Sequence, residues 1–272
     1  MGRIDDKETI LKRLETLKAY QQCSIVVDLI YGLPDQTMKI WLEDLEILEA
    51  SAIDGMDIYQ LNVFDNSELN KRIQKGCISP AATTAQEAEM YEAAIDFLNK
   101  RPFKRLSVCH WSRNSRERNL YNTMAKQDYP MFPFGCGAGG RIGGYSTMLH
   151  RAFMPYEIMA MQGKKPFMFF MKELPTQPIF NTIVSQMDQC HFDLRPLIKM
   201  DTRLKELKWL FDLWCDRKLA IYNGVTYKLT TAGEFWQVNM TQTVIECVQT
   251  LLTGTQTIIR QNIAAQDQLI YK

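Results

Sequence analysis

The sequence lacks the short cysteine spacings that hold a metal ion or a cluster. No two of its seven cysteines have C-x2-C or C-x3-C spacing. They are Cys23, Cys77, Cys109, Cys136, Cys190, Cys215 and Cys247. This distribution argues against a local zinc or iron–sulfur knuckle and, with no export signal, against a disulfide framework. We therefore expect reduced, mostly buried thiols and predict no metal ligand.

Histidine and the common catalytic motifs are also scarce. The chain has three histidines, and none forms an H-x-x-H or H-E-x-x-H pair. No G-x-S-x-G elbow and no phosphate-binding P-loop occurs. Residue spacing by itself therefore predicts no catalytic residue.

Neither an excess of charge nor a long apolar run is present. The formal net charge is +1, so bulk electrostatics indicates neither a nucleic-acid partner nor an anionic membrane. The chain has no run of 18 apolar residues and its start has no apolar signal core, so we expect a cytoplasmic protein without a membrane partner. With 272 residues, 46% of them hydrophobic and 23% charged, the composition is that of a globular protein with one large or two smaller domains.

What the sequence does contain is a strand–helix–strand pattern. The stretch Cys23–Gly32 is rich in β-branched residues and predicts a buried strand. After a Gly-Leu-Pro break, Thr37 can begin a helix, and Met56–Phe64 reads as a second strand. A connection of this length predicts parallel neighbouring strands with a right-handed crossover, and therefore an α/β fold.

One acid stands within the first of these strands. Asp28 lies in the run "VDLIYGLPDQT", a few residues before the chain turns. A carboxylate in an apolar run is costly unless it is hydrogen-bonded. Either a structural amide or a ligand hydroxyl satisfies it, and the residues alone leave both alternatives open.

Further elements follow this unit. Thr84 and Glu87 have capping-box spacing and predict the start of a long helix. The run Phe103–Trp111, "FKRLSVCHW", reads as a strand. From about Met154 the pattern becomes helical, which favours a division into residues 1–150 and a mainly helical region 151–272.

The C-terminal region has the order helix, hairpin, helix. Asp201 can cap a helix that reaches Trp214, and Asn223-Gly224 is a strong signal for a two-residue hairpin turn. This order is typical of a winged helix. The following stretch "TTAGEFWQVNMTQT" offers no arginine or lysine to read a groove, which argues against nucleic acid.

Two other segments are candidate sites. The glycine-rich stretch Gly135–Gly144 allows either a tight strand crossing or close approach to a ligand, and no helical pattern follows it as phosphate binding would require. A basic cluster lies beside Trp111, either as a solvated face or as a clamp for carboxylates. The cluster is His110, Arg113, Arg116 and Arg118.

Several segments, in order, resemble the oxygen-independent coproporphyrinogen III oxidase-like family of radical S-adenosylmethionine enzymes. They are "VDLIYGLPDQT", "DIYQLNVFDNSEL", "MYEAAIDFL" and "CHWSR". The further stretches "RERNLYN" and "GCGAGGRIGGYSTM" are similar to its haem-utilisation branch, which includes anaerobic haem-degrading methyltransferases. The resemblance runs from about Gly2 into the C-terminal region.

The resemblance implies a fold and a set of site residues. The two parallel strands would be the last two of a partial (β/α)6 barrel, followed by an α+β extension and a winged-helix-like region on the substrate side. Asp28 would contact S-adenosylmethionine, and Asn62 and Arg141 would line a second S-adenosylmethionine site. The sequence departs from the coproporphyrinogen oxidase pattern at both second-site positions. His110 and Arg113 would lie near the tetrapyrrole, with the arginines of the basic cluster, Arg116 and Arg118 included, as partners for propionates.

The largest departure is the family's C-x3-C-x2-C segment, whose thiolates hold a [4Fe–4S] cluster in full-length members. This sequence has no such spacing. We therefore read it as the C-terminal part of such an enzyme, not catalytically competent as given. The family also implies haem or a related porphyrin as partner and a flavodoxin-type electron donor. Two hypotheses follow: part of an enzyme that methylates and opens haem, or a non-catalytic haem- or porphyrin-binding or trafficking protein.

Overall fold

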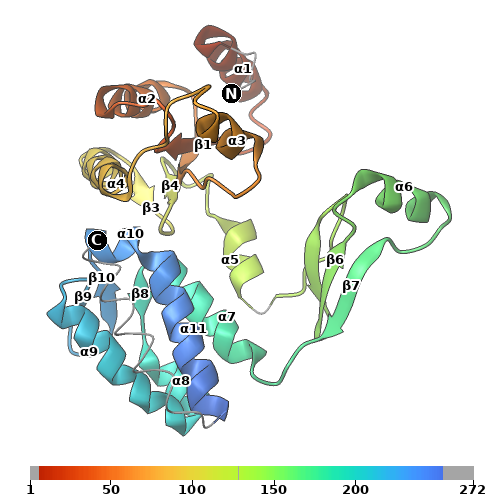
Figure 1. Ribbon diagram of the computed structural model, residues 1–272, viewed down its shortest axis with the longest axis vertical. Helices are drawn as coiled ribbons and strands as arrows, with labels where there is room; N and C mark the ends of the chain where they lie inside the picture. Colours follow the sequence, from red (N-terminus) through yellow and green to blue (C-terminus); the bar gives the residue numbers. More distant parts are fainter. Residues whose placement is uncertain (1–5, 128, 254–272) are drawn as a thin grey trace. The chain divides into compact units, whose positions relative to one another are not determined.

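The computed structural model describes residues 6–127 and 129–253 (Figure 1). The chain forms two compact units, each built from three separate segments. The first takes in Met1–Asn119, Asp188–Phe192 and Lys208–Met240; the second takes in Leu120–Met187, Asp193–Leu207 and Thr241–Lys272. The predicted division of the chain near residue 150 stays a prediction.

The first unit contains two small sheets and their helices. Its elements are α1 (Lys7–Tyr20), β1 (Val26–Tyr31), α2 (Met38–Ala50), β2 (Gly55–Gln60), α3 (Glu68–Gln74), α4 (Thr84–Asn99), β3 (Lys104–Arg105), β4 (His110–Ser112), β8 (His191–Phe192), α9 (Lys208–Asp216), β9 (Ala220–Tyr222), β10 (Tyr227–Leu229) and α10 (Thr231–Phe235).

The second unit contains a three-stranded sheet and several helices. Its elements are α5 (Leu120–Lys126), β5 (Gly139–Ile142), β6 (Tyr145–Leu149), α6 (Phe153–Met161), β7 (Phe167–Lys172), most of α7 (Gln177–Asp188), α8 (Leu194–Met200), the 3-10 helix η1 (Thr202–Leu207) and most of α11 (Gln237–Thr253).

The predicted strand–helix–strand unit is confirmed. Strands β1 and β2 pair in parallel, and the Thr37 side chain caps α2 by accepting a hydrogen bond from the Ile40 amide. The core lies on the face of the sheet toward α2 and α4, where Trp41 is fully buried and its indole donates to the Met90 carbonyl at 2.8 Å. Alternate residues of β1 and β2 therefore lie on the opposite face.

The stretch Phe103–Trp111 does not form one strand. It forms the short antiparallel strands β3 and β4, and the sheet order becomes β1-β2-β4-β3, with parallel and antiparallel pairs. The backbone reverses because the Leu106 amide donates to the His110 carbonyl at 2.8 Å, and the Ser107 hydroxyl accepts from the His110 amide at 3.2 Å. The prediction of a continuous strand was wrong because these local bonds close a turn.

Helix α4 begins one residue earlier in its capping pattern than predicted. The capping box joins Thr83 and Gln86, not Thr84 and Glu87. Glu87 is turned inward instead: it is 7% exposed, and its carboxylate accepts a hydrogen bond from the Gln60 side chain at 2.7 Å. Glu87 therefore bonds to a residue of β2 and takes no part in capping the helix.

The order of α9, a β9–β10 hairpin and α10 agrees with the predicted helix, hairpin and helix. The connection is a four-residue loop, because Tyr222 pairs with Tyr227. The Asn223 side chain closes it by accepting from the amides of Val225 and Thr226. The predicted two-residue turn is therefore wrong, although its asparagine does shape the loop.

Asp201 does not cap one continuous helix to Trp214. It ends α8, and the chain passes through η1 before α9 begins at Lys208. The Asp201 carboxylate accepts from the Arg203 amide at 2.9 Å, which favours the tight 3-10 turn at this point.

The glycine-rich stretch forms a β-hairpin in the second unit. Strands β5 and β6 pair antiparallel around the Gly143-Gly144 turn, and β7 joins the other edge of β6. Helix α6 forms the connection between β6 and β7 (Figure 1). Strand β7 lies in a region that we predicted to be helical; its run "FMFFM" pairs with β6, and Phe170 stacks on Tyr145.

Within the residues that the structure describes, no helix is both long enough and apolar enough to cross a lipid bilayer.

Candidate functional site

A row of polar side chains crosses the open face of the first sheet. Asp28 on β1 pairs in register with Asp57 on β2, which in turn pairs with His110 on β4. All three lie on the face opposite α2 and α4, because their strand neighbours Val27, Met56 and Trp111 pack in or against the core. The sheet thus places two carboxyls and one imidazole side by side.

The two ends of this row differ in exposure. Asp28 is exposed, whereas Asp57 and His110 are 5% and 3% exposed. The expectation that Asp28 lies in a buried strand was therefore wrong. Within the described residues β1 is paired only with β2, and residues of its open face such as Ile30 remain accessible.

His110 is held at both ring nitrogens by carboxylates. Its Nδ1 lies 2.8 Å from Asp57 Oδ1 in a hydrogen bond, and its Nε2 lies 3.3 Å from Glu117 Oε1, within ion-pair distance. Burial alone would lower the pKa of His110, but the hydrogen bond and charge of Asp57 and the charge of Glu117 raise it above the ordinary value. The two carboxylates therefore favour the charged form of the imidazole.

The pKa of Asp28 is influenced by the other residues of the same row. Its pKa is raised, first by partial desolvation of the carboxyl, and then by the charge of Asp57 and a hydrogen bond to it. The charge of His110 acts in the opposite direction and lowers the pKa of Asp28. The protonation of Asp28 thus depends on both neighbours.

A glycine makes room for the second carboxylate. A Cβ at Gly55 would lie 3.1 Å from Glu117 Cγ and 2.8 Å from the Trp111 carbonyl oxygen. Gly55 lies two residues before Asp57, on the same face of β2. Its missing side chain leaves space in which Glu117 lies over the sheet and approaches His110.

The arginines of the basic cluster have different surroundings. Arg113 Nη1 donates to the carbonyls of Glu49 and Ser51 at 2.7 and 2.9 Å. Arg116 Nη2 donates to the carbonyls of Gln21 and Cys23 at 3.0 and 2.9 Å. These bonds fasten the ends of α2 and α1, respectively.

Arg118 and Asn62 are both exposed. Arg118 lies in the loop after β4, close in sequence to Glu117. Asn62 follows the carboxyl end of β2, where ligands bind in parallel α/β folds. Both side chains are therefore accessible from solvent.

Arg141 belongs to the second unit, on β5. Its Nε donates to Glu173 Oε1 at 2.5 Å, and its Nη2 donates to Asn181 Oδ1 at 3.1 Å. Glu173 also accepts from the Ser146 hydroxyl at 2.7 Å. The arginine therefore ties the β5–β6 hairpin to the start of the segment after β7 and to α7.

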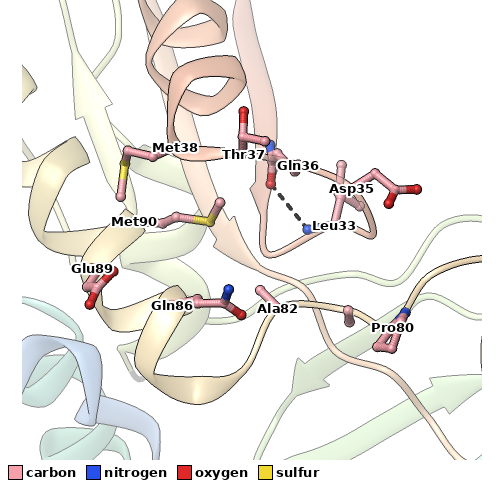
Figure 2. A pocket seen from close by; sticks show the side chains of 11 residues that line it. Leu33, Asp35, Gln36, Thr37, Met38, Pro80, Ala82, Gln86, Glu89 and Met90 are labelled. Atoms are coloured by element: carbon pink, nitrogen blue, oxygen red, sulfur yellow. Dashed lines mark hydrogen bonds between the residues drawn. The ribbon is translucent and has the colours of Figure 1, made fainter.

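A pocket of about 510 Å³ lies beside the loop that follows β1 (Figure 2). It is formed by this loop and by the approach to and first turns of α4, and the loop is closed by the Leu33 amide, which donates to Gln36 Oε1 at 3.2 Å. Its lining is Leu33, Asp35, Gln36, Thr37, Met38, Pro80, Ala81, Ala82, Gln86, Glu89 and Met90. The two acids favour a hydrogen-bond donor or a cation over a phosphate.

The sequence analysis missed Asp57, Glu117 and this pocket. A signal for Asp57 was present: each parallel strand carries aspartate as its third residue, and equal positions lie opposite each other in register. Glu117 lies in a loop, and no sequence pattern indicates which strand a loop carboxylate will contact. In residues 6–127 and 129–253, no group of three or more histidine, cysteine, aspartate or glutamate side chains is arranged so that it could hold a metal ion.

Comparisons with known proteins agree with the resemblance seen in the sequence. No family model matches the chain. Anaerobilin synthase from Escherichia coli O157:H7 is 32% identical over 252 residues, which is 92% of this chain and 56% of that protein. Heme chaperone HemW from Bacillus subtilis (strain 168) is 25% identical over 148 residues, which is 54% of this chain and 38% of that protein.

A solved structure shows the same fold. Coproporphyrinogen III oxidase (HemN) from Escherichia coli, a radical SAM enzyme, has a TM-score of 0.71 at 18% identity, covering 89% of this chain and 59% of that one. The chain spans just over half the length of anaerobilin synthase and less of the chaperone. The chain is homologous to anaerobilin synthase along most of its length, and it shares its fold with the radical S-adenosylmethionine enzyme coproporphyrinogen III oxidase.

Proposed function

We propose that this chain is part of a radical S-adenosylmethionine protein that acts on haem or a related porphyrin. The observation that carries the proposal is the 252-residue match to anaerobilin synthase, which extends through both compact units. For the complete protein we propose anaerobic haem degradation by methyl transfer and ring opening. In this proposal β1 and β2 are the last strands of a partial barrel, and the α9–β9–β10–α10 region is its winged-helix-like cover.

Asp28 is the proposed contact for S-adenosylmethionine. It is exposed on the open face of the sheet, and a carboxylate suits a cofactor that carries a sulfonium, an amine and ribose hydroxyls. The pocket after β1 presents Asp35 and Glu89, which suit the same donor groups. Asn62 and Arg141 remain proposed second-site residues, each on its own unit.

The [4Fe–4S] cluster would supply the electron that cleaves S-adenosylmethionine. The described cysteines do not form a site for it, so none of them is assigned a role in that chemistry. We propose that this chain alone is inactive, that the complete protein takes electrons from a flavodoxin-type donor, and that it works in the cytoplasm.

Among the proposed substrate residues, Arg118 is the best placed to meet a propionate. Its side chain is exposed, whereas Arg113 and Arg116 donate to main-chain carbonyls and His110 is buried. A guanidinium in solvent can turn toward a carboxylate without breaking a bond that fastens a helix. His110 is a substrate residue only if the row that holds it opens.

Binding of S-adenosylmethionine by the chain tests the first part of the proposal. Equilibrium dialysis with labelled S-adenosylmethionine should show binding that weakens about tenfold in Asp28→Asn, because the charged acceptor is lost. Asp96→Asn, an exposed acid on α4, is the matched control and should bind as the wild type does. Equal binding by both variants would remove Asp28 from the site.

Haem titration followed by optical absorption tests the second part. Arg118→Ala should weaken haem binding several-fold, while Arg72→Ala, an exposed arginine on α3, should leave it unchanged. Saturable haem binding with the same affinity in the wild type and in both variants would contradict our placement of the propionates. A chain that binds no haem at all would contradict the proposed substrate class.

The match to a heme chaperone favours one alternative, a haem-binding or trafficking protein that performs no chemistry. Such a protein would release its haem intact. Incubation of the haem-loaded chain with apomyoglobin distinguishes the two: spectroscopic transfer of unmodified haem supports trafficking, and retention supports the enzyme part.

A further inference from the structure

The polar row on the open face contains more acid than base. Asp28, Asp57 and Glu117 are three carboxyls along a line that holds a single imidazole, His110. Two of the side chains, Asp57 and His110, are almost fully buried. A buried carboxyl is costly without a partner, and the hydrogen bond with His110 supplies that partner for Asp57; a charged imidazole offsets the burial more strongly than a neutral one.

The charges at the buried end of the row also influence the pKa of Asp28 at its exposed end. Asp57 lies between His110 and Asp28, and it raises the pKa of Asp28 while His110 lowers it. If His110 lost its proton, Asp57 would face Asp28 without compensation. The shared proton would then stay on Asp28, which would lose part of its capacity to accept hydrogen bonds.

We propose that Asp57 and Glu117 are positioning residues that hold His110 as an imidazolium, and that this imidazolium keeps Asp28 ionised toward S-adenosylmethionine. The inference rests on the proposed function only in naming the ligand of Asp28. It gives His110 a role through Asp57 rather than at the porphyrin. Gly55 is part of the arrangement, because a Cβ there would lie 2.8 Å from the Trp111 carbonyl oxygen and would crowd Glu117 Cγ at 3.1 Å.

Other titratable groups near the row do not supply this charge. Tyr59 follows Asp57 on the same face of β2, and its pKa is raised by burial and then by Cys109, Asp57 and Asp28. Its phenol is therefore neutral at physiological pH. Among these neighbours, His110 is the one that brings positive charge to Asp28.

Two substitutions with opposite effects separate this proposal from a merely structural role. Asp57→Asn removes the negative neighbour, so the titration midpoint of Asp28 should fall and that of His110 should fall by about one pH unit. His110→Gln removes the compensating charge, so the midpoint of Asp28 should rise. General loosening of the sheet would move Asp28 in the same direction in both variants.

The titrations are measured by NMR on the whole chain. Aspartate ¹³C-carboxyl signals report Asp28, assigned by the signal lost in Asp28→Asn. Histidine ¹⁵N signals report His110, assigned among three histidines by the signal lost in His110→Gln. Asp96→Asn is the control that should change neither. If His110→Gln fails to fold, Glu117→Gln serves in its place with a smaller rise expected at Asp28.

Dialysis with S-adenosylmethionine gives the functional readout. His110→Gln should bind about five- to tenfold more weakly at neutral pH, and the deficit should shrink as rising pH ionises Asp28 in the variant. A deficit that does not change with pH overturns the proposal, and so does an Asp28 midpoint that is the same in wild type, Asp57→Asn and His110→Gln. If the wild type binds no S-adenosylmethionine, the proposed function fails, while the NMR midpoints still decide whether the row is coupled.

Discussion

Two buried carboxylates in the first unit, those of Asp54 and Glu234, are matched to basic side chains. Asp54 accepts from Lys18 Nζ and from the amide of Ile25, and Glu234 pairs with Arg105 at 2.6 Å. Pairs of this kind add little over an apolar core, but they are costly to break because one charge is left buried. At the scale of residues, the stability of the first unit is therefore sensitive to the loss of one member of such an ion pair.

The His110 pair predicts a pH dependence of stability. Its folded-state pKa is raised above 6.5, so its contribution to stability is full below pH 6.5 and is lost as pH rises through the raised value. For every tenfold tightening of proton binding on folding, the charged imidazole contributes about 1.4 kcal/mol. We expect the wild-type Tm to fall over this window in circular dichroism, and the fall to be smaller in Asp57→Asn. Parallel profiles for the two proteins would contradict the assignment.

Glu234 predicts a large loss of stability on truncation. The side chain is buried, and Glu234→Ala leaves the Arg105 guanidinium without its carboxylate, so we expect a loss of about 3–5 kcal/mol in urea unfolding. The exposed pair of Lys208 with Asp212 provides the control, since Lys208→Ala should cost at most about 1 kcal/mol. Similar losses in both variants would mean that burial does not set the strength of the Arg105 pair.

At the scale of elements, the end of strand β1 is fixed by the turn at Gly32. Gly32 has φ +87°, and its carbonyl accepts from the Ala82 amide at 3.1 Å, which draws the segment before α4 to the end of the strand. A Cβ there would lie 2.7 Å from Glu87 Oε1. The Gly-Leu-Pro break in the sequence is thus a turn that also borders a buried carboxylate.

Substitution at Gly32 tests this account. Gly32→Ala should destabilise by about 2–3 kcal/mol, from the left-handed backbone and from displacement of Glu87. Gly76→Ala shares the positive φ of +67° but has open space around its Cβ, so it should cost only about 1–2 kcal/mol. Urea unfolding measures both. Equal losses would show that contact with Glu87 contributes nothing.

The whole chain is interleaved, because each compact unit draws on three segments. In the first unit, Glu234 and Phe235 of α10 contact Arg105 and Tyr91 near and on α4. A truncation after Asn119 would therefore remove Glu234 and Phe235 from their contacts with Arg105 and Tyr91. Neither unit corresponds to one continuous stretch of sequence.

This interleaving predicts the behaviour of a truncated chain. A protein of residues 1–119 should unfold at a markedly lower temperature than the whole chain, or without a cooperative transition, because Tyr91 and Arg105 lose their cover. Thermal unfolding by circular dichroism measures this, with Arg101→Ala in the whole chain as a control that disturbs α4 without removing α10. A transition equal to that of the whole chain would contradict the interleaved unit.

Local patterns predicted the elements that depend on neighbours in sequence. The parallel β1–α2–β2 unit, the Thr37 cap and the β9–β10 hairpin follow from periodicity and from the side chains beside each turn. The continuous strand at Phe103–Trp111 and the helical reading of β7 were wrong. In both places the outcome was decided by pairing with a strand distant in sequence or by a turn closed by side chains.

The sequence by itself determined the α/β class and the parallel strand pair that carries Asp28, because these follow from residue order and local pattern. Only the tertiary structure decided what surrounds Asp28: that it is exposed, that Asp57 and His110 continue its row, and that Glu117 completes it above Gly55. The physical reason is that burial and charge compensation arise between residues tens of positions apart. Strand register brings those residues together, and that register is set by packing of the whole sheet.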